Sequence, residues 1–173
     1  TSEDLRGSIA VYTFDYTSNP DPARQTTDVM RDIGARLAQE DLGDVKVELV
    51  TMTIDPDKDT PEVLGAIDAT PEPNGVPWTF VTGDSAAVRV AVNYGFGVYY
   101  ERTDDGRISF DPTFVIVDGL GIERARYRFG LPSPDDVVAD LMSVVREAKA
   151  ATGSARLAYE AAHLFSCYAP PSQ

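Results

Sequence analysis

The chain has a single cysteine, Cys167, and a single histidine, His163, among its 173 residues. These counts exclude an intramolecular disulfide, dithiol redox chemistry within one chain and a Cys/His zinc site. No signal-peptide pattern opens the sequence and no apolar run reaches the roughly eighteen residues of a membrane span. We therefore expect any membrane contact to depend on a segment outside this chain.

Positive charge is also scarce. Asp and Glu number 28 against 15 Lys and Arg, which gives a formal charge of −13. Such a surface repels phosphate backbones and anionic lipid headgroups. The composition therefore disfavours nucleic acid and a polybasic membrane anchor as partners. Hydrophobic residues make up 43% of the chain, a typical globular content, and the length suits one domain.

The order of hydrophobic patterns predicts an α/β domain. Short β-rich runs alternate with amphipathic helical segments, and the Asp104-Asp105-Gly106 turn signal predicts an inserted hairpin within 99–110. The last two strands are separated by a short Gly-containing turn, so they should pair antiparallel and make the sheet mixed. The expected strands are 8–14, 45–54, 79–81, 113–117 and 122–128, and the main expected helices are 22–39, one starting near Pro61, one near Asp84, 134–149 and 155–167.

Several motifs narrow this prediction to one family. The run Tyr12-x-Phe14-x-Tyr16-Thr17-Ser18 closes the first strand, and Asp55-Pro56-x-x-Asp59-Thr60-Pro61 follows the second. Over residues 5–150 the chain resembles the SCO/SenC family of copper proteins. The resemblance implies a thioredoxin-like fold and a role in copper handling or cytochrome oxidase assembly.

The family's metal ligands are missing. The resemblance places the two cysteines of a C-x-x-x-C motif at Asn19 and Ala23, with the following proline at Arg24, and the histidine at Phe110 or Asp111. Amide, methyl, phenyl and carboxylate groups do not replace two thiolates and an imidazole as ligands for copper. We therefore expect a degenerate copper site with no cofactor, and copper remains implied only by the resemblance.

Pro112 resembles the cis-proline that faces the cysteines of thioredoxins, so a cis Asp111–Pro112 bond is expected. Two weak metal alternatives stay open. His163 and Cys167 are spaced i, i+4 on the predicted tail helix and can meet one soft metal. Acidic residues, Asp104, Asp105 and Asp111 among them, can line a site for a hard cation.

Aromatic residues are dense around the degenerate site, and they either pack the loop shut or expose a partner surface. They are Tyr12, Phe14, Tyr16, Tyr94, Phe96, Tyr99 and Tyr100.

The sequence shows no catalytic constellation, because the only histidine is in the tail. The expectation is therefore a non-enzymatic, partner-binding SCO/SenC-like protein, with a metal-binding protein using other ligands as the alternative. Residues 1–152 should form the domain and 153–173 a helical extension that leads to a removed membrane anchor. By resemblance the protein is expected to be extracytoplasmic and membrane-tethered. The apolar residues Leu157, Leu164 and Phe165 of the tail helix should pack on the domain, or on a second copy in a homodimer, because a helix this short is marginal alone in water.

Overall fold

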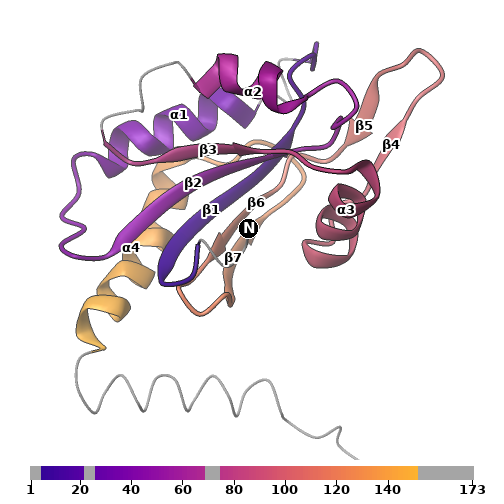
Figure 1. Ribbon diagram of the computed structural model, residues 1–173. Helices are drawn as coiled ribbons and strands as arrows, with labels where there is room; N and C mark the ends of the chain where they lie inside the picture. The colour runs from indigo at the N-terminus through magenta and orange to yellow at the C-terminus, as the bar shows by residue number, and fades with distance from the viewer. Residues whose placement is uncertain (1–4, 22–25, 69–74, 152–173) are drawn as a thin grey trace, which may run out of the picture.

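A computed structural model describes residues 5–21, 26–68 and 75–151. Its five-stranded sheet has the order β3-β2-β1-β6-β7, with β1 at Ser8–Asp15 in the centre. Strands β2 (Lys46–Thr53) and β3 (Trp78–Val81) run parallel to β1, whereas β6 (Phe114–Val117) and β7 (Glu123–Tyr127) add antiparallel pairings. The predicted mixed α/β sheet is confirmed (Figure 1).

The long helices α1 (Thr26–Leu37) and α4 (Pro134–Ala150) cover one face of this sheet. Their buried side chains, such as Ile33 and Leu141, pack with Val11 and Ile116 from the strands. Helix α4 begins with Pro134 at its first turn, has acids near its N-terminus and Lys149 in its last turn, an order that suits the helix dipole. The short α2 (Pro61–Asp68) contacts β3 at the sheet edge.

The opposite face is covered by α3 (Ser85–Arg89), which continues as the π-helix η2 (Val90–Gly95). The Asp84 carboxylate caps α3 by accepting hydrogen bonds from the amides of Ala86 and Ala87 at 2.9 and 3.2 Å. The predicted helix near Asp84 therefore exists, although its second half is a π-helix rather than an α-helix.

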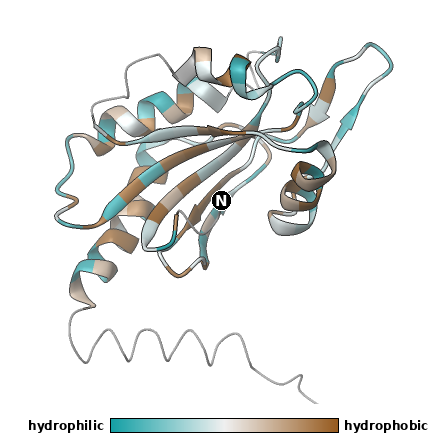
Figure 2. Cartoon of the chain, in the orientation of Figure 1, coloured by the Kyte–Doolittle hydropathy of each residue, from teal (hydrophilic) through white to brown (hydrophobic). Residues whose placement is uncertain are grey.

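The predicted hairpin is formed by β4 (Tyr100–Arg102) and β5 (Ile108–Phe110). These strands pair only with each other, so the hairpin is a separate two-stranded sheet. It projects beyond the end of the main sheet next to α3, and Figure 2 shows its turn as hydrophilic. No helix in the described part of the chain is long and apolar enough to cross a bilayer. The predicted tail helix and the 153–173 extension lie outside the described residues.

Candidate functional site: the loop after the first strand

The loop that follows β1 is organised by a buried carboxylate at the end of that strand. One oxygen of Asp15 accepts from the amide of Tyr16 and from Asn19 Nδ2, each at 2.8 Å. The other accepts from the amide and the hydroxyl of Thr26, both at 2.9 Å. Because Thr26 is the first residue of α1, Asp15 joins the loop, the strand and the helix N-terminus. Burial raises the pKa of the Asp15 carboxyl, and its four hydrogen bonds oppose that rise.

Asn19 lies at one of the two positions where the resemblance places cysteine. Its Nδ2 donates to Asp15, and its Oδ1 accepts from the amide of Asp21 at 3.1 Å, a local turn contact. The backbone amide of Asn19 also donates to the carbonyl of Tyr16 at 3.0 Å. The side chain therefore holds the shape of the loop. Ala23 and Arg24 lie outside the described residues.

A second buried carboxylate fastens this loop to the neighbouring strand. Asp59, only 1% exposed, accepts from both the amide and the hydroxyl of Thr17 in the loop and from the hydroxyl of Thr53 at the end of β2. Between these elements lies a cavity of about 270 Å³, lined by hydroxyl, carboxylate and apolar groups that include Asp15, Thr17, Asp59 and Phe80.

The three acids of the 55–59 segment have separate partners. Asp55, also 1% exposed, pairs with the Arg102 guanidinium of the hairpin at 2.6 Å, and Lys58 Nζ lies 3.6 Å from its second oxygen. Asp57 accepts from the Ser85 hydroxyl at 2.6 Å, next to the start of α3. The segment therefore connects the loop, the hairpin and α3.

The hairpin brings Phe110 next to Tyr16 in the loop that holds Asn19, whereas Asp111, just after β5, lines a cleft on the other side of the hairpin. The rings of Phe110 and Tyr16 pack edge to face, with their centroids 6.1 Å apart. The Tyr16 hydroxyl also accepts a hydrogen bond from the amide of Ile108 at 3.4 Å. A cleft of about 510 Å³, lined by Asn19 and Asp21 on one side and Ile108 and Ser109 on the other, separates the loop from β5. Phe110 is 3% exposed within the aromatic core, whereas Asp111 is exposed.

Pro112 is buried, and the Asp111–Pro112 peptide bond is trans. The expectation of a cis bond is therefore wrong for this chain. The isomer of an X–Pro bond in a folded protein depends on the tertiary packing around it, which the sequence resemblance does not specify.

The donors in this region do not suit copper. Asn19 offers an amide already engaged at both ends, Phe110 a buried ring and Asp111 a hard carboxylate. Within residues 5–21, 26–68 and 75–151, no three His, Cys, Asp or Glu side chains form a group that could hold a metal ion. This includes the acids proposed for a hard cation. His163 and Cys167 lie outside the described residues.

The aromatic residues divide into two groups. Phe14 and Tyr16 are buried, and Tyr12 and Phe96 pack half-buried against the same cluster. Tyr94 and Tyr99, in contrast, are 82% and 75% exposed. Some of the predicted aromatic set therefore closes the site, and some is displayed on the surface.

Sequence reasoning missed the roles of Asp15, Asp55 and Asp59. A detectable signal was present for Asp15, since an acid ends a strand one short loop before a helix that begins with threonine. The partners of the other two acids, Arg102 and Thr17, are 47 and 42 residues away, so no local pattern reveals them.

The strand order and the flanking helices define a thioredoxin-like α/β protein. Comparison with family profiles finds a match to SCO1/SenC over residues 1–146. The chain belongs to the SCO1/SenC family, which confirms the resemblance found in its motifs.

Several solved structures of Sco proteins have a fold similar to that of this chain. Arabidopsis thaliana ScoI with copper bound has a TM-score of 0.67 at 18% identity, over 83% of this chain and 87% of that one. BsSco, described as a member of the Sco family of cytochrome c oxidase assembly proteins, has a TM-score of 0.69 at 21% identity, over 83% and 84%. A SCO1/SenC family lipoprotein from Bacillus anthracis has a TM-score of 0.66 at 23% identity, over 83% and 84%. A search of curated proteins finds no match.

Proposed function

We propose that this chain is a partner-binding member of the SCO1/SenC family that works in copper handling or cytochrome oxidase assembly without carrying copper at the usual loop. Family membership supports the context. Similar structures include one described with copper bound and one from a family described as cytochrome c oxidase assembly proteins. The proposed role is non-enzymatic: among the candidate residues that the structure describes, no nucleophile lies beside a base, and the only histidine of the sequence is in the tail.

One observation carries this proposal. The side chain at the first expected cysteine position, Asn19, uses its amide nitrogen and oxygen to hold the loop through Asp15 and Asp21. The only cysteine of the chain is Cys167, far along the sequence. A loop without thiolates offers neither the soft ligands that select copper nor a nucleophile for disulfide exchange.

The proposal extends to organisation and location. We propose that residues 1–152 act as the SCO/SenC-type domain and residues 153–173 as an extension towards a membrane anchor, with the domain outside the cytoplasm. The similarity to a lipoprotein of the same family supports the tethered arrangement.

Calorimetric titration of the full chain with Cu(I) and Cu(II) tests the proposal. We expect no stoichiometric binding at micromolar metal at this loop, and no disulfide reductase activity. The triple variant Asn19→Cys/Ala23→Cys/Asp111→His should gain copper binding, since it restores two thiolates and an imidazole to the positions matched by the resemblance. A parallel variant carries Phe110→His in place of Asp111→His, because the resemblance places the histidine of the family at either of these two positions.

The two outcomes that matter are separable by mutation. Tight copper binding by the unmodified chain that is lost on Asn19→Ala but survives His163→Ala/Cys167→Ala contradicts the proposal. Binding that is lost only in His163→Ala/Cys167→Ala supports the alternative, a metal-binding protein using ligands outside the family pattern.

A further inference from the structure

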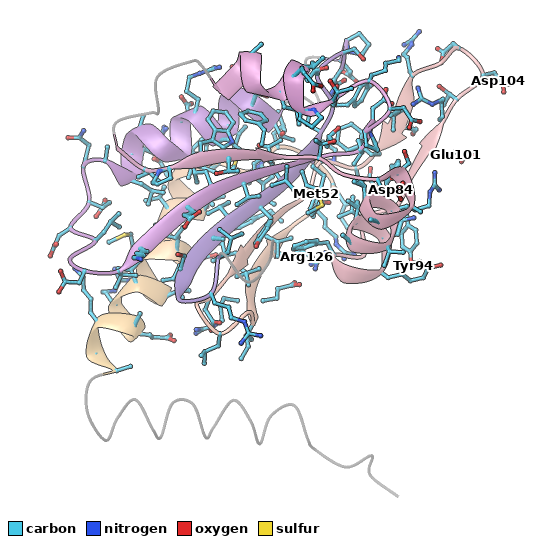
Figure 3. All side chains as sticks on the ribbon, viewed as in Figure 1. Met52, Asp84, Tyr94, Glu101, Asp104 and Arg126 are labelled. Atoms are coloured by element: carbon cyan, nitrogen blue, oxygen red, sulfur yellow. The ribbon has the colours of Figure 1, made fainter. Side chains whose placement is uncertain are left out.

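The β4–β5 hairpin and the helix beside it enclose a second cleft, on the side away from the Asn19 loop. This helix–hairpin cleft has a volume of about 570 Å³, and its lining includes Arg89, Asn93, Tyr99, Glu101 and Asp111. Figure 3 shows Glu101 and Asp104 on the hairpin and Tyr94 on the outside of η2, all directed away from the main sheet. Three residues of the lining, Tyr99, Glu101 and Asp111, are exposed, so the cleft is accessible from solvent.

The two tyrosines in the lining of this cleft, Tyr99 and Tyr100, differ in their contacts within the described residues. Tyr100 lies under the Arg89 guanidinium, whose carbon is 5.2 Å from the ring centroid, so this ring already has a cation. Tyr99 is 75% exposed and makes no ring or cation contact in the described part of the chain. Exposed tyrosines are enriched at protein interfaces because they bury a large area and also carry a hydroxyl.

The charges of the hairpin are unbalanced. Arg102 is paired with buried Asp55, and Arg107 with Asp105 at 2.8 Å, so both hairpin arginines are neutralised. Glu101, Asp104 and Asp111 are exposed and have no ion-pair partner within the described ranges. The lining of the cleft thus combines the exposed ring of Tyr99 with two exposed carboxylates, Glu101 and Asp111, and one cation, Arg89, which lies over Tyr100. Asp104 adds further negative charge at the turn of the hairpin.

We propose that the helix–hairpin cleft binds a basic segment of a partner protein, with an arginine or lysine side chain stacking on Tyr99 and pairing with Glu101 and Asp111. Charge complementarity identifies the occupant. A second copy of this chain and a nucleic acid both carry strong negative charge, and the −13 charge of this chain disfavours them. A planar guanidinium suits the site better than an ammonium because it stacks and forms bidentate bonds to carboxylates. This inference rests on the proposed partner-binding function and specifies the surface and chemistry involved.

The test uses the full ¹⁵N-labelled chain and a synthetic ten-residue peptide of alternating arginine and glycine at low ionic strength. We expect amide shifts to concentrate in residues 99–111. Glu101→Gln/Asp111→Asn should weaken peptide affinity about tenfold and Tyr99→Ala about threefold, in line with one cation–aromatic contact and two exposed charge pairs. The same peptide with glutamate in place of arginine should not bind.

The matched control is Glu40→Gln/Asp44→Asn, which removes the same charge from two exposed carboxylates in the connection between α1 and β2. It should change affinity less than twofold. Equal weakening by both double variants, shifts spread over the whole acidic surface, or absence of peptide binding would each overturn the proposal. Amide spectra of each variant establish that it is folded.

Copper titration of the same samples separates the two proposals. If the unmodified chain binds copper at the Asn19 loop, the proposed function fails whatever the peptide does. If it binds no copper there and the hairpin variants leave peptide affinity unchanged, only the assignment of this cleft fails.

Discussion

One face of the central sheet is covered by the long helices α1 and α4, and the other by α3, η2 and the β4–β5 hairpin. The first face is mainly aliphatic, with Ile33, Leu37 and Leu141 fully buried. The second contains the aromatic side chains of Phe14, Tyr16 and Phe110, and it continues into the loop and the hairpin. The comparison indicates that the aliphatic face supplies most of the stability, and that the aromatic face sets the shape of the candidate site.

The largest effect is expected on the aliphatic face. Leu141→Ala should lower the free energy of unfolding by about 3 kcal/mol, because it leaves a cavity between α4 and the sheet. Urea denaturation followed by circular dichroism measures this loss. Leu131→Ala, at a position 38% exposed, should cost less than about 0.5 kcal/mol. Similar losses for both variants would show that α4 packing does not dominate.

On the aromatic face, Phe96→Ala should cost about 2 kcal/mol. The Phe96 ring lies 4.8 Å from that of Tyr12 and 5.0 Å from that of Phe14, but it is only partly buried. The near-ultraviolet circular dichroism of the tyrosines should change as well. Tyr94→Ala, which removes a side chain that is 82% exposed, serves as the control and should leave stability unchanged. A loss that exceeds that of Leu141→Ala would reverse the comparison.

A smaller loss, about 1–2 kcal/mol, is expected for Asp59→Asn. The amide group has one oxygen in place of two and carries no charge, so it is a weaker acceptor for the bonds from Thr17 and Thr53, and one of these side chains faces an NH2 donor instead of an oxygen. Hydrogen exchange should increase most at the amide of Thr17, which donates to Asp59 at 3.1 Å. Asp57→Asn removes the same charge at an exposed position and should leave that amide protected.

The smallest effect is a pH dependence from Asp15. Burial raises the pKa of this carboxyl in the folded protein above its value in the unfolded chain, about 3.9. The folded state therefore binds the proton more tightly. Protonated Asp15 therefore contributes to the free energy of unfolding. This contribution is fully present below the pKa of the unfolded chain and is lost as pH rises through the pKa of the folded protein.

Asp15→Asn lacks this titration, so the stability difference between wild type and variant should shrink as pH rises through that window. Carboxyl carbon shifts in an NMR titration give the pKa directly. A midpoint below 3.9 would contradict the prediction, since it would mean that the four hydrogen bonds outweigh burial.

The strands and the long helices could be predicted from sequence because alternation and helical spacing are local signals. The aliphatic spacing of Val137, Leu141 and Val145 defines α4, and Pro134 marks its start. The π-helix could not be predicted, because the four-residue spacing of Val88 and Val92 also fits an α-helix. The candidate site was predicted only in outline. The motifs located the Asn19 loop, but the bonds from Asp55 to Arg102 and from Asp59 to Thr17 connect residues more than 40 positions apart.

The central position of β1 has a consequence for folding. Strand β1 pairs with β2, about 40 residues later in the chain, and also with β6, about 100 residues later. The second pairing raises the contact order, so folding should be slow for a chain of this size. While the chain is being synthesised, one edge of β1 stays unpaired until β6 is made. Its backbone amides and carbonyls then offer an open strand edge to other nascent chains. We therefore expect the need for chaperones during synthesis to increase with the time that separates the synthesis of β1 from that of β6.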